Sequence, residues 1–142
     1  MKTVRDILHA KGHDIWCVAP ENTVFEALER MAEKQVGALV VMDGTRVAGI
    51  ISERDYARKV VLLGRTSPQT LVREIMTSHV AYTHLDQSVE ECMAIMTDKR
   101  FRHLPVIEQD KLVGIVSIGD LVKSIISEQR FMIEQLERYI TG

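Results

Sequence analysis

The sequence predicts a mixed α/β fold built from two copies of one unit of about 65 residues. Two observations lead to this prediction: the chain repeats itself, and both copies show the same order of strand-like and helix-like patterns. The chain has 142 residues, of which 46% are apolar and 27% charged, so it can bury a core. One copy alone would be marginal, because small domains bury a smaller share of their surface.

The repeat becomes visible when Thr23 is aligned with Ser88 and the offset of 65 residues is kept without a gap. The pairs matched in this way include Glu26 and Glu91, Met31 and Met96, Leu39 and Leu104, Gly49 and Gly114, Ser52 and Ser117, and Asp55 and Asp120. Residues 4–8 resemble residues 72–76 three residues out of phase, so the first copy has a longer lead-in.

These alignments give the expected division of the chain. We expect a first repeat with its lead-in over residues 1–66 and a second repeat over residues 67–126. Residues 127–142 extend a C-terminal helix. Because the linker over residues 64–69 is short, we expect the two small sheets to pack into one body.

Each copy starts a helix with a capping box, in which Ser or Thr is followed three residues later by Glu. The boxes are Thr23 to Glu26 and Ser88 to Glu91, and apolar residues follow both at helical spacing. A β-hairpin and a second helix come next in each copy. Short apolar runs predict the hairpin strands at residues 37–42 and 47–51, and at 103–107 and 112–116, with further short strands near 15–18 and 80–83. Pro105 belongs at a strand start or edge, because it cannot donate to a ladder.

A long helix is predicted from about Asp120 to Ile140. Its apolar positions include Ile126, Ile133 and Ile140, which are seven residues apart, as in a coiled coil with one Gln in the seam. This face either packs on the core of the protein itself or forms a homodimer contact.

Composition excludes several classes of protein. The formal net charge of −2 argues against general nucleic-acid binding, which needs a basic face. Neither a signal peptide nor an apolar run of membrane-spanning length is present, so we expect a cytoplasmic protein without membrane contact. Cys17 and Cys92 are too far apart for a zinc motif and are expected to be structural thiols.

The motif Gly-x-x-Ser-x-x-Asp ends each hairpin, with Ser52 and Asp55 in the first copy and Ser117 and Asp120 in the second. Ser and Asp at this spacing form an ordinary helix cap. The same geometry also creates a site for anions and hydroxyls, where a carboxylate can accept hydrogen bonds from a ribose diol. Both interpretations fit the sequence.

The order of these motifs and their duplication resemble a tandem CBS-domain pair, or Bateman module, such as the small stand-alone CBS proteins of bacterial signal transduction. The resemblance rests on the capped helices, both Gly-x-x-Ser-x-x-Asp turns and the segment from Arg102 to Val106, and it extends from about Val4 to Ile126. It implies a regulatory module that binds adenosine-containing ligands (AMP, ADP, ATP, NAD or S-adenosylmethionine) in clefts between the repeats.

The resemblance also implies roles for individual residues. Asp55 and Asp120 would hold the ribose hydroxyls. Ser52 and Ser117, together with Arg54 and Arg58 beside Asp55, would contact ribose or phosphate. Arg102 and His103 would bind phosphate. Candidates for the adenine slot are Val18, Val41, Val80, Tyr82 and Val106.

The two copies differ in these candidate ligand residues. Gly37 and Ala38 occupy the positions of Arg102 and His103, so the first copy lacks that phosphate pair. We therefore expect the two copies to differ in charge and in ligand occupancy.

No catalytic or metal-binding set stands beside these residues. His9 and His13 are four apart, but Gly12 disfavours a helix there and no third ligand is near, so we expect no metal site. No nucleophile, base and oxyanion-binding group occur together, so we expect no enzymatic activity. The resemblance implies a sensor that signals to an unidentified protein partner and forms a homodimer. The alternatives are an interaction or dimerisation module without ligand, an enzyme, and a nucleic-acid binder.

Overall fold

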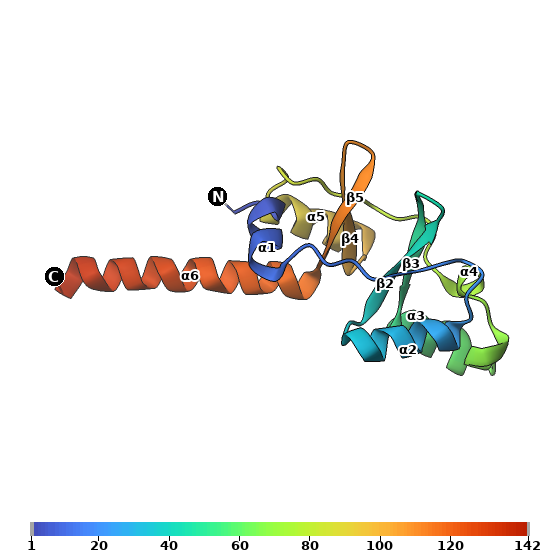
Figure 1. Cartoon of the computed structure of the whole chain (residues 1–142). Helices are drawn as coiled ribbons and strands as arrows, with labels where there is room; N and C mark the ends of the chain where they lie inside the picture. Colours follow the sequence, from blue (N-terminus) through green and yellow to red (C-terminus); the bar gives the residue numbers. More distant parts are fainter. Residues whose placement is uncertain (1, 142) are drawn as a thin grey trace. The chain divides into compact units, whose positions relative to one another are not determined.

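The structure is a computed structural model that describes residues 2–141. The chain forms two compact units. The Asp55 unit comprises Asp14–Val80, and the Asp120 unit comprises the N-terminal segment up to His13 together with the chain from Ala81 onward. The predicted α/β class is confirmed, since each unit contains a small sheet and helices (Figure 1).

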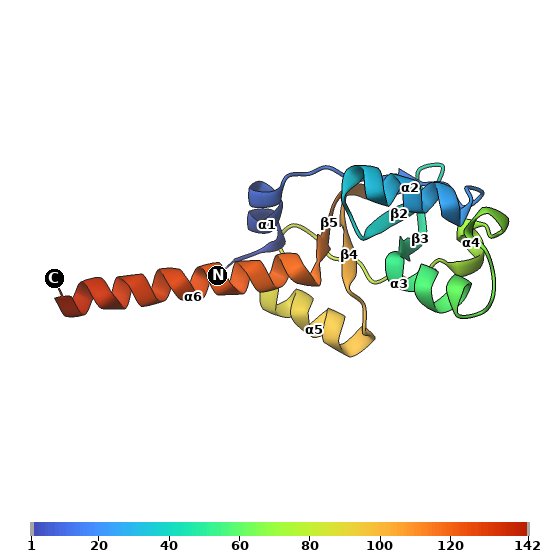
Figure 2. The ribbon, with the colours of Figure 1, turned by 90° about the horizontal axis from the view of Figure 1, so that it is seen from below.

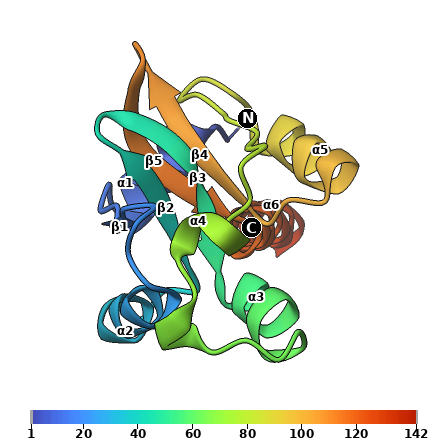
Figure 3. The same cartoon turned by 90° about the vertical axis from the view of Figure 1, so that its right-hand side faces the viewer.

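The Asp55 unit has a three-stranded sheet in the order β1-β2-β3. Its elements are β1 (Cys17–Val18), α2 (Val24–Lys34), β2 (Ala38–Asp43), β3 (Arg46–Ser52), α3 (Glu53–Tyr56), a π-helical turn (Ala57–Val61), a 3₁₀ turn (Ser67–Gln69) and α4 (Val72–Ile75). Strand β1 runs parallel to β2, and β2 and β3 form an antiparallel hairpin. Figure 3 shows α2 and α3 near the lower end of this hairpin.

The Asp120 unit has a two-stranded antiparallel sheet. Its elements are α1 (Val4–Lys11), α5 (Val89–Lys99), β4 (His103–Glu108), β5 (Lys111–Ser117) and α6 (Ile118–Thr141). Helices α1 and α5 flank the start of α6 from opposite sides, and α6 continues well beyond both of them (Figure 2). The long C-terminal helix predicted from the sequence is therefore present.

Both predicted capping boxes form. The hydroxyl of Thr23 accepts a hydrogen bond from the backbone N–H of Glu26 at 3.1 Å, and Ser88 does the same for Glu91 at 3.1 Å. In return, the backbone N–H of Thr23 donates to the Glu26 carboxylate, which lowers the pKa of Glu26 below its usual value. The caps fix the first turn of α2 and α5 and so orient their apolar faces toward the sheets.

Each unit has its own apolar core. Val24, Met31, Leu39 and Ile51 are at most 2% exposed in the Asp55 unit. The core of the Asp120 unit contains the equivalent side chains and Cys92, which is fully buried as predicted. Burial raises the pKa of the Cys92 thiol, which fits a structural role.

The lead-in segment of each repeat belongs to the unit formed by the main part of the other repeat. Helix α1 belongs to the Asp120 unit, where Thr3 forms an antiparallel bridge with Ser88 at the start of α5. Helix α4 belongs to the Asp55 unit, where Leu71 bridges Thr23 at the start of α2. Each unit thus combines the main part of one repeat with the lead-in of the other copy. The sequence boundaries at residues 66 and 126 describe the repeats along the chain and stay a prediction.

The prediction of a strand near residues 80–83 is wrong. Only Thr83 pairs, in an isolated parallel bridge to Val106, with its N–H donating to the carbonyl of Pro105 at 3.0 Å. Pro105 has no N–H, so this edge of β4 offers few donors to a neighbouring strand. Pro105 does lie on an edge, as predicted. Among residues 2–141, no helix combines the length and apolar character needed to cross a membrane.

A close backbone approach at Gly49 gives a first testable prediction. A Cβ atom at this position would lie 2.5 Å from the carbonyl oxygen of Thr77, whose backbone pairs with Ile50. Gly49→Ala should therefore lower the free energy of unfolding by about 2 kcal/mol, because backbone cannot move aside as a side chain can. Urea denaturation measures the effect.

Gly37→Ala is the matched control. Its added Cβ would meet only Glu53 Oε1 at an ordinary 3.7 Å, so the stability should change by less than about 0.5 kcal/mol. Equal stability of the two variants would contradict the tight packing of β3 on Thr77.

Candidate functional site

The strand-to-helix turns of the two units share one geometry. At the end of β5, the backbone N–H of Ser117 donates to Asp120 Oδ2 at 2.8 Å, and Ser117 Oγ accepts from the Asp120 N–H at 3.1 Å. At the end of β3, Ser52 and Asp55 make the same pair of bonds at 2.9 and 3.3 Å. Each Ser-x-x-Asp motif is thus a reciprocal helix cap, and its carboxylate is held at the helix N-terminus.

A lysine from a distant segment joins the Asp120 turn. Lys11, the last residue of α1, donates to Asp120 Oδ2 at 2.7 Å and to the carbonyl of Ile115 at 2.9 Å. The side chains of Lys11 and Asp120 are 33% and 17% exposed, so this ion pair is largely shielded from water. Sequence reasoning missed Lys11, because its contact spans 109 residues and depends on the exchange of the lead-in helices.

Two opposing effects set the ionisation of Asp120. Burial by itself would raise the pKa of this carboxyl. The hydrogen bonds from Lys11 and from the Ser117 backbone outweigh burial, so the pKa of Asp120 lies below its usual value. Asp120 is therefore ionised at neutral pH and acts only as a hydrogen-bond acceptor.

The Asp55 turn also has a lysine, supplied from nearby in the sequence. Lys59 lies 3.4 Å from Asp55 Oδ1 and donates to the carbonyl of Ile75 at 3.0 Å. The i,i+4 spacing of Asp55 and Lys59 on one helical segment is a signal that could have identified this pair from sequence.

The two residues predicted to bind phosphate, Arg102 and His103, lie beside the Asp120 turn. His103 is directly opposite Ser117 in the β4–β5 ladder, and the carbonyl of Arg102 accepts from the Ile118 N–H at 2.9 Å. Arg102 is exposed and His103 half-buried. The structure therefore brings Arg102 and His103 to the same strand end as Asp120.

The Asp55 unit repeats this frame without the cationic pair. Ala38 is opposite Ser52 in the β2–β3 ladder, and the carbonyl of Gly37 accepts from the Glu53 N–H at 3.0 Å. The residues Gly37 and Ala38 are thus the structural as well as the sequence counterparts of Arg102 and His103. On α3 and the turn after it, Arg54 is half-buried and Arg58 is exposed.

The adenine-slot candidates differ in accessibility. Val41 and Val106 are fully buried in the two cores, and Val18 is 8% exposed. Neither Val41 nor Val106 is therefore accessible to a base in this structure. Val80 is half-buried, and Tyr82 is 45% exposed and offers an accessible ring.

Over residues 2–141, no three His, Cys, Asp or Glu side chains gather closely enough to hold a metal ion. His13 lies with Nδ1 3.4 Å from the carbonyl of Val113.

Comparison with known proteins identifies the family. The model of the CBS domain matches residues 4–62 and 72–127, which are the two repeats. This chain belongs to the CBS-domain family. Proteins with CBS domains are generally regulatory, and two matched segments make this chain a CBS pair.

Individual relatives support the assignment. The CBS domain-containing protein CBSX3, mitochondrial, of Arabidopsis thaliana is 39% identical over 150 residues, covering 99% of this chain and 72% of CBSX3. A candidate signal-transduction protein with CBS domains from Burkholderia ambifaria MC40-6 has a structure 53% identical to this chain, with a TM-score of 0.86, covering 90% of this chain and 96% of that one. The CBS-domain pair of protein MJ0100, solved with 5′-methylthioadenosine and S-adenosyl-L-methionine, is similar in fold alone, with a TM-score of 0.78 and 23% identity over 90% of this chain and 98% of that one.

The ion pair of Lys11 and Asp120 makes a testable prediction about pH. Lys11→Met should lower the free energy of unfolding at pH 7 by about 1 kcal/mol, because it leaves a half-buried carboxylate without its cation. The folded-state pKa of Asp120 is depressed, so the stabilisation is present above the unfolded pKa of about 4 and is lost as the pH falls through the folded value. The difference between variant and wild type should therefore narrow below about pH 4 in urea titrations.

Lys111→Met removes an exposed lysine from the same unit and serves as the control. Its stability should follow that of wild type at every pH. A Lys11→Met deficit that stays constant down to pH 3 would show that Lys11 stabilises the unit through packing and not through charge.

Proposed function

We propose that this CBS pair is a regulatory sensor of an adenosine-containing ligand of the AMP, ADP, ATP, NAD or S-adenosylmethionine class, and that Asp120 binds the ribose. One observation carries the proposal: the ionised carboxylate of Asp120 lies at the same strand end as Arg102 and His103. A ribose diol and a phosphate attached to it need an acceptor and a cation at neighbouring positions, as this arrangement offers.

Each group would have a defined part in recognition. Lys11 keeps Asp120 ionised, which is the state that accepts hydrogen bonds from two ribose hydroxyls. Ser117 holds the carboxylate in place, and the N-terminus of α6 adds a favourable potential for an anion. Arg102 and His103 would contact the phosphate, and Tyr82 and the backbone near Val106 would contact adenine.

The Asp55 unit would bind a different ligand or bind more weakly. Asp55 and Ser52 can hold a ribose in the same way, but Gly37 and Ala38 provide no phosphate ligand. Arg54 and Arg58 are the candidates for any phosphate contact in this unit. We therefore propose unequal occupancy, with Val18 and Val41 near the base in the Asp55 unit.

A sensor also needs an output. A ligand can shift an equilibrium only through different affinities for two conformations. We propose that the readout passes to a protein partner or to a homodimer, and that the protein acts in the cytoplasm without catalysing a reaction. The net charge of −2 gives no support to nucleic-acid binding. A ligand-free interaction module is the alternative.

Thermal-shift titration with AMP, ADP, ATP, NAD, NADH and S-adenosylmethionine tests the proposal. At least one compound should raise the melting temperature, since a ligand at 100 times its Kd stabilises the native state by about 2.7 kcal/mol. The response of Asp120→Asn is measured against the ligand-free melting temperature of the same variant. This variant should need at least about ten times more ligand for the same rise in melting temperature, because it has lost a charged acceptor.

Asp55→Asn is the matched variant in the other unit. It should leave the response to the phosphate-bearing ligand within about twofold of wild type, because the phosphate pair is in the Asp120 unit. No shift with any compound would favour the ligand-free module. Equal losses in both variants would contradict the proposed asymmetry.

A further inference from the structure

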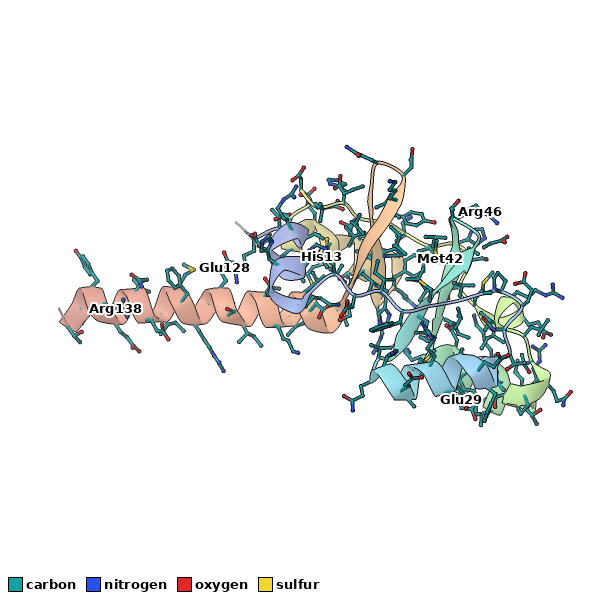
Figure 4. The ribbon with its side chains drawn as sticks, viewed as in Figure 1. His13, Glu29, Met42, Arg46, Glu128 and Arg138 are labelled. Carbon is teal, nitrogen blue, oxygen red and sulfur yellow. The ribbon has the colours of Figure 1, made fainter. Side chains whose placement is uncertain are left out.

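Helix α6 exposes an apolar face that its own unit does not cover. The seam residues are exposed by 42% at Val122, 45% at Ile126, 55% at Ile133, 60% at Leu136 and 80% at Ile140. All residues from Gln129 to Thr141 are exposed. Figure 4 shows side chains projecting above and below α6 near the labelled Glu128 and Arg138.

The spacing of this face is that of a coiled-coil seam. Positions 122, 126, 129, 133, 136 and 140 alternate steps of four and three residues, and only position 129, a Gln, is polar. Met132 and Tyr139 lie on the adjoining row and widen the apolar face. A helix with an apolar stripe of this length and with water on all sides is typical of an interface.

We propose that a second copy of this chain covers the seam, with the two α6 helices antiparallel. The a positions of the heptad are 126, 133 and 140, and the d positions are 122, 129 and 136. In the antiparallel alignment each a position meets a d position of the other helix. Ile126 packs against the partner's Leu136, Ile133 against the partner's Gln129, and Val122 against the partner's Ile140. Every apolar seam residue of one copy thereby finds a counterpart on the other.

The flanking charges favour the antiparallel alignment. Lys123 lies beside the partner's Glu137, and symmetry makes this opposite-charge pair twice. Arg130 meets the partner's Arg130 at the twofold axis, where Glu134 one turn along the same helix offsets the repulsion. In the parallel alignment the corresponding neighbours are Ile125 with the partner's Arg130 and Met132 with the partner's Glu137, so no opposite charges meet.

The antiparallel pairing of α6 gives a geometry to the proposed self-association and does not depend on ligand binding. Loss of dimerisation and loss of the response to adenosine compounds are separate measurements, so either proposal can fail alone.

Charge reversal on the full chain tests the alignment by sedimentation equilibrium. Lys123→Glu and Glu137→Lys should each weaken the dimer at least about tenfold, because each places like charges side by side twice. The double variant Lys123→Glu/Glu137→Lys restores opposite pairs and should return the dimer Kd to within about threefold of wild type. Arg138→Glu, on the face away from the seam, is the control and should leave the Kd unchanged.

Cysteine cross-linking provides an independent readout. Met132 lies near the twofold axis of the antiparallel pair, so Met132→Cys should form a disulfide-linked dimer. A parallel pair would instead bring position 129 onto its own counterpart and cross-link Gln129→Cys. A wild-type protein that stays monomeric at about 100 μM would overturn the proposal, because even a weak specific dimer is populated at that concentration. Single charge-reversal variants without effect, or a double variant whose dimer stays weak, would also overturn it. So would cross-linking that occurs only through Gln129→Cys.

Discussion

The reciprocal hydrogen bonding of Ser117 and Asp120 is the interaction around which the Asp120 unit is organised. It ends β5, starts α6 and holds a carboxylate at the helix N-terminus. Lys11 binds that carboxylate and the carbonyl of Ile115, and so ties α1 to both elements. Lys11 therefore joins α1 to two consecutive elements that lie more than 100 residues further along the chain, and it keeps the carboxylate in its acceptor state.

The two units show how one backbone frame can carry different chemistry. Ser52 and Asp55 repeat the cap, and Ala38 repeats the ladder position of His103. The two units differ in charge at the start of the first hairpin strand, which is β2 in one unit and β4 in the other. They also differ in the lysine beside the aspartate, because Asp55 pairs with Lys59 from its own helical segment and Asp120 pairs with Lys11 from a lead-in helix. Duplication preserved the geometry that can hold a ribose, while substitution changed what can be bound next to it.

Much of this arrangement could be predicted because it is local. The capped helices, both hairpins and the Ser-x-x-Asp turns depend on residues within a few positions of one another. Lys11 could not be predicted, because its role follows from the placement of α1 in the unit of the other repeat. The strand predicted near residues 80–83 does not form, because it would have to pair with the edge of β4 where Pro105 lacks an N–H donor. Within this segment, only Thr83 makes hydrogen bonds to this edge.

We propose that the Asp120 unit recognises a phosphate attached to adenosine through Arg102. Isothermal titration calorimetry of AMP and adenosine, with wild type and with Arg102→Gln, measures this recognition. AMP should bind wild type more tightly than adenosine does. Arg102→Gln should weaken the binding of AMP about tenfold and leave that of adenosine within about twofold, as expected for the loss of one charge-assisted hydrogen bond. Equal affinities of wild type for AMP and adenosine, or equal losses for both in the variant, would contradict it.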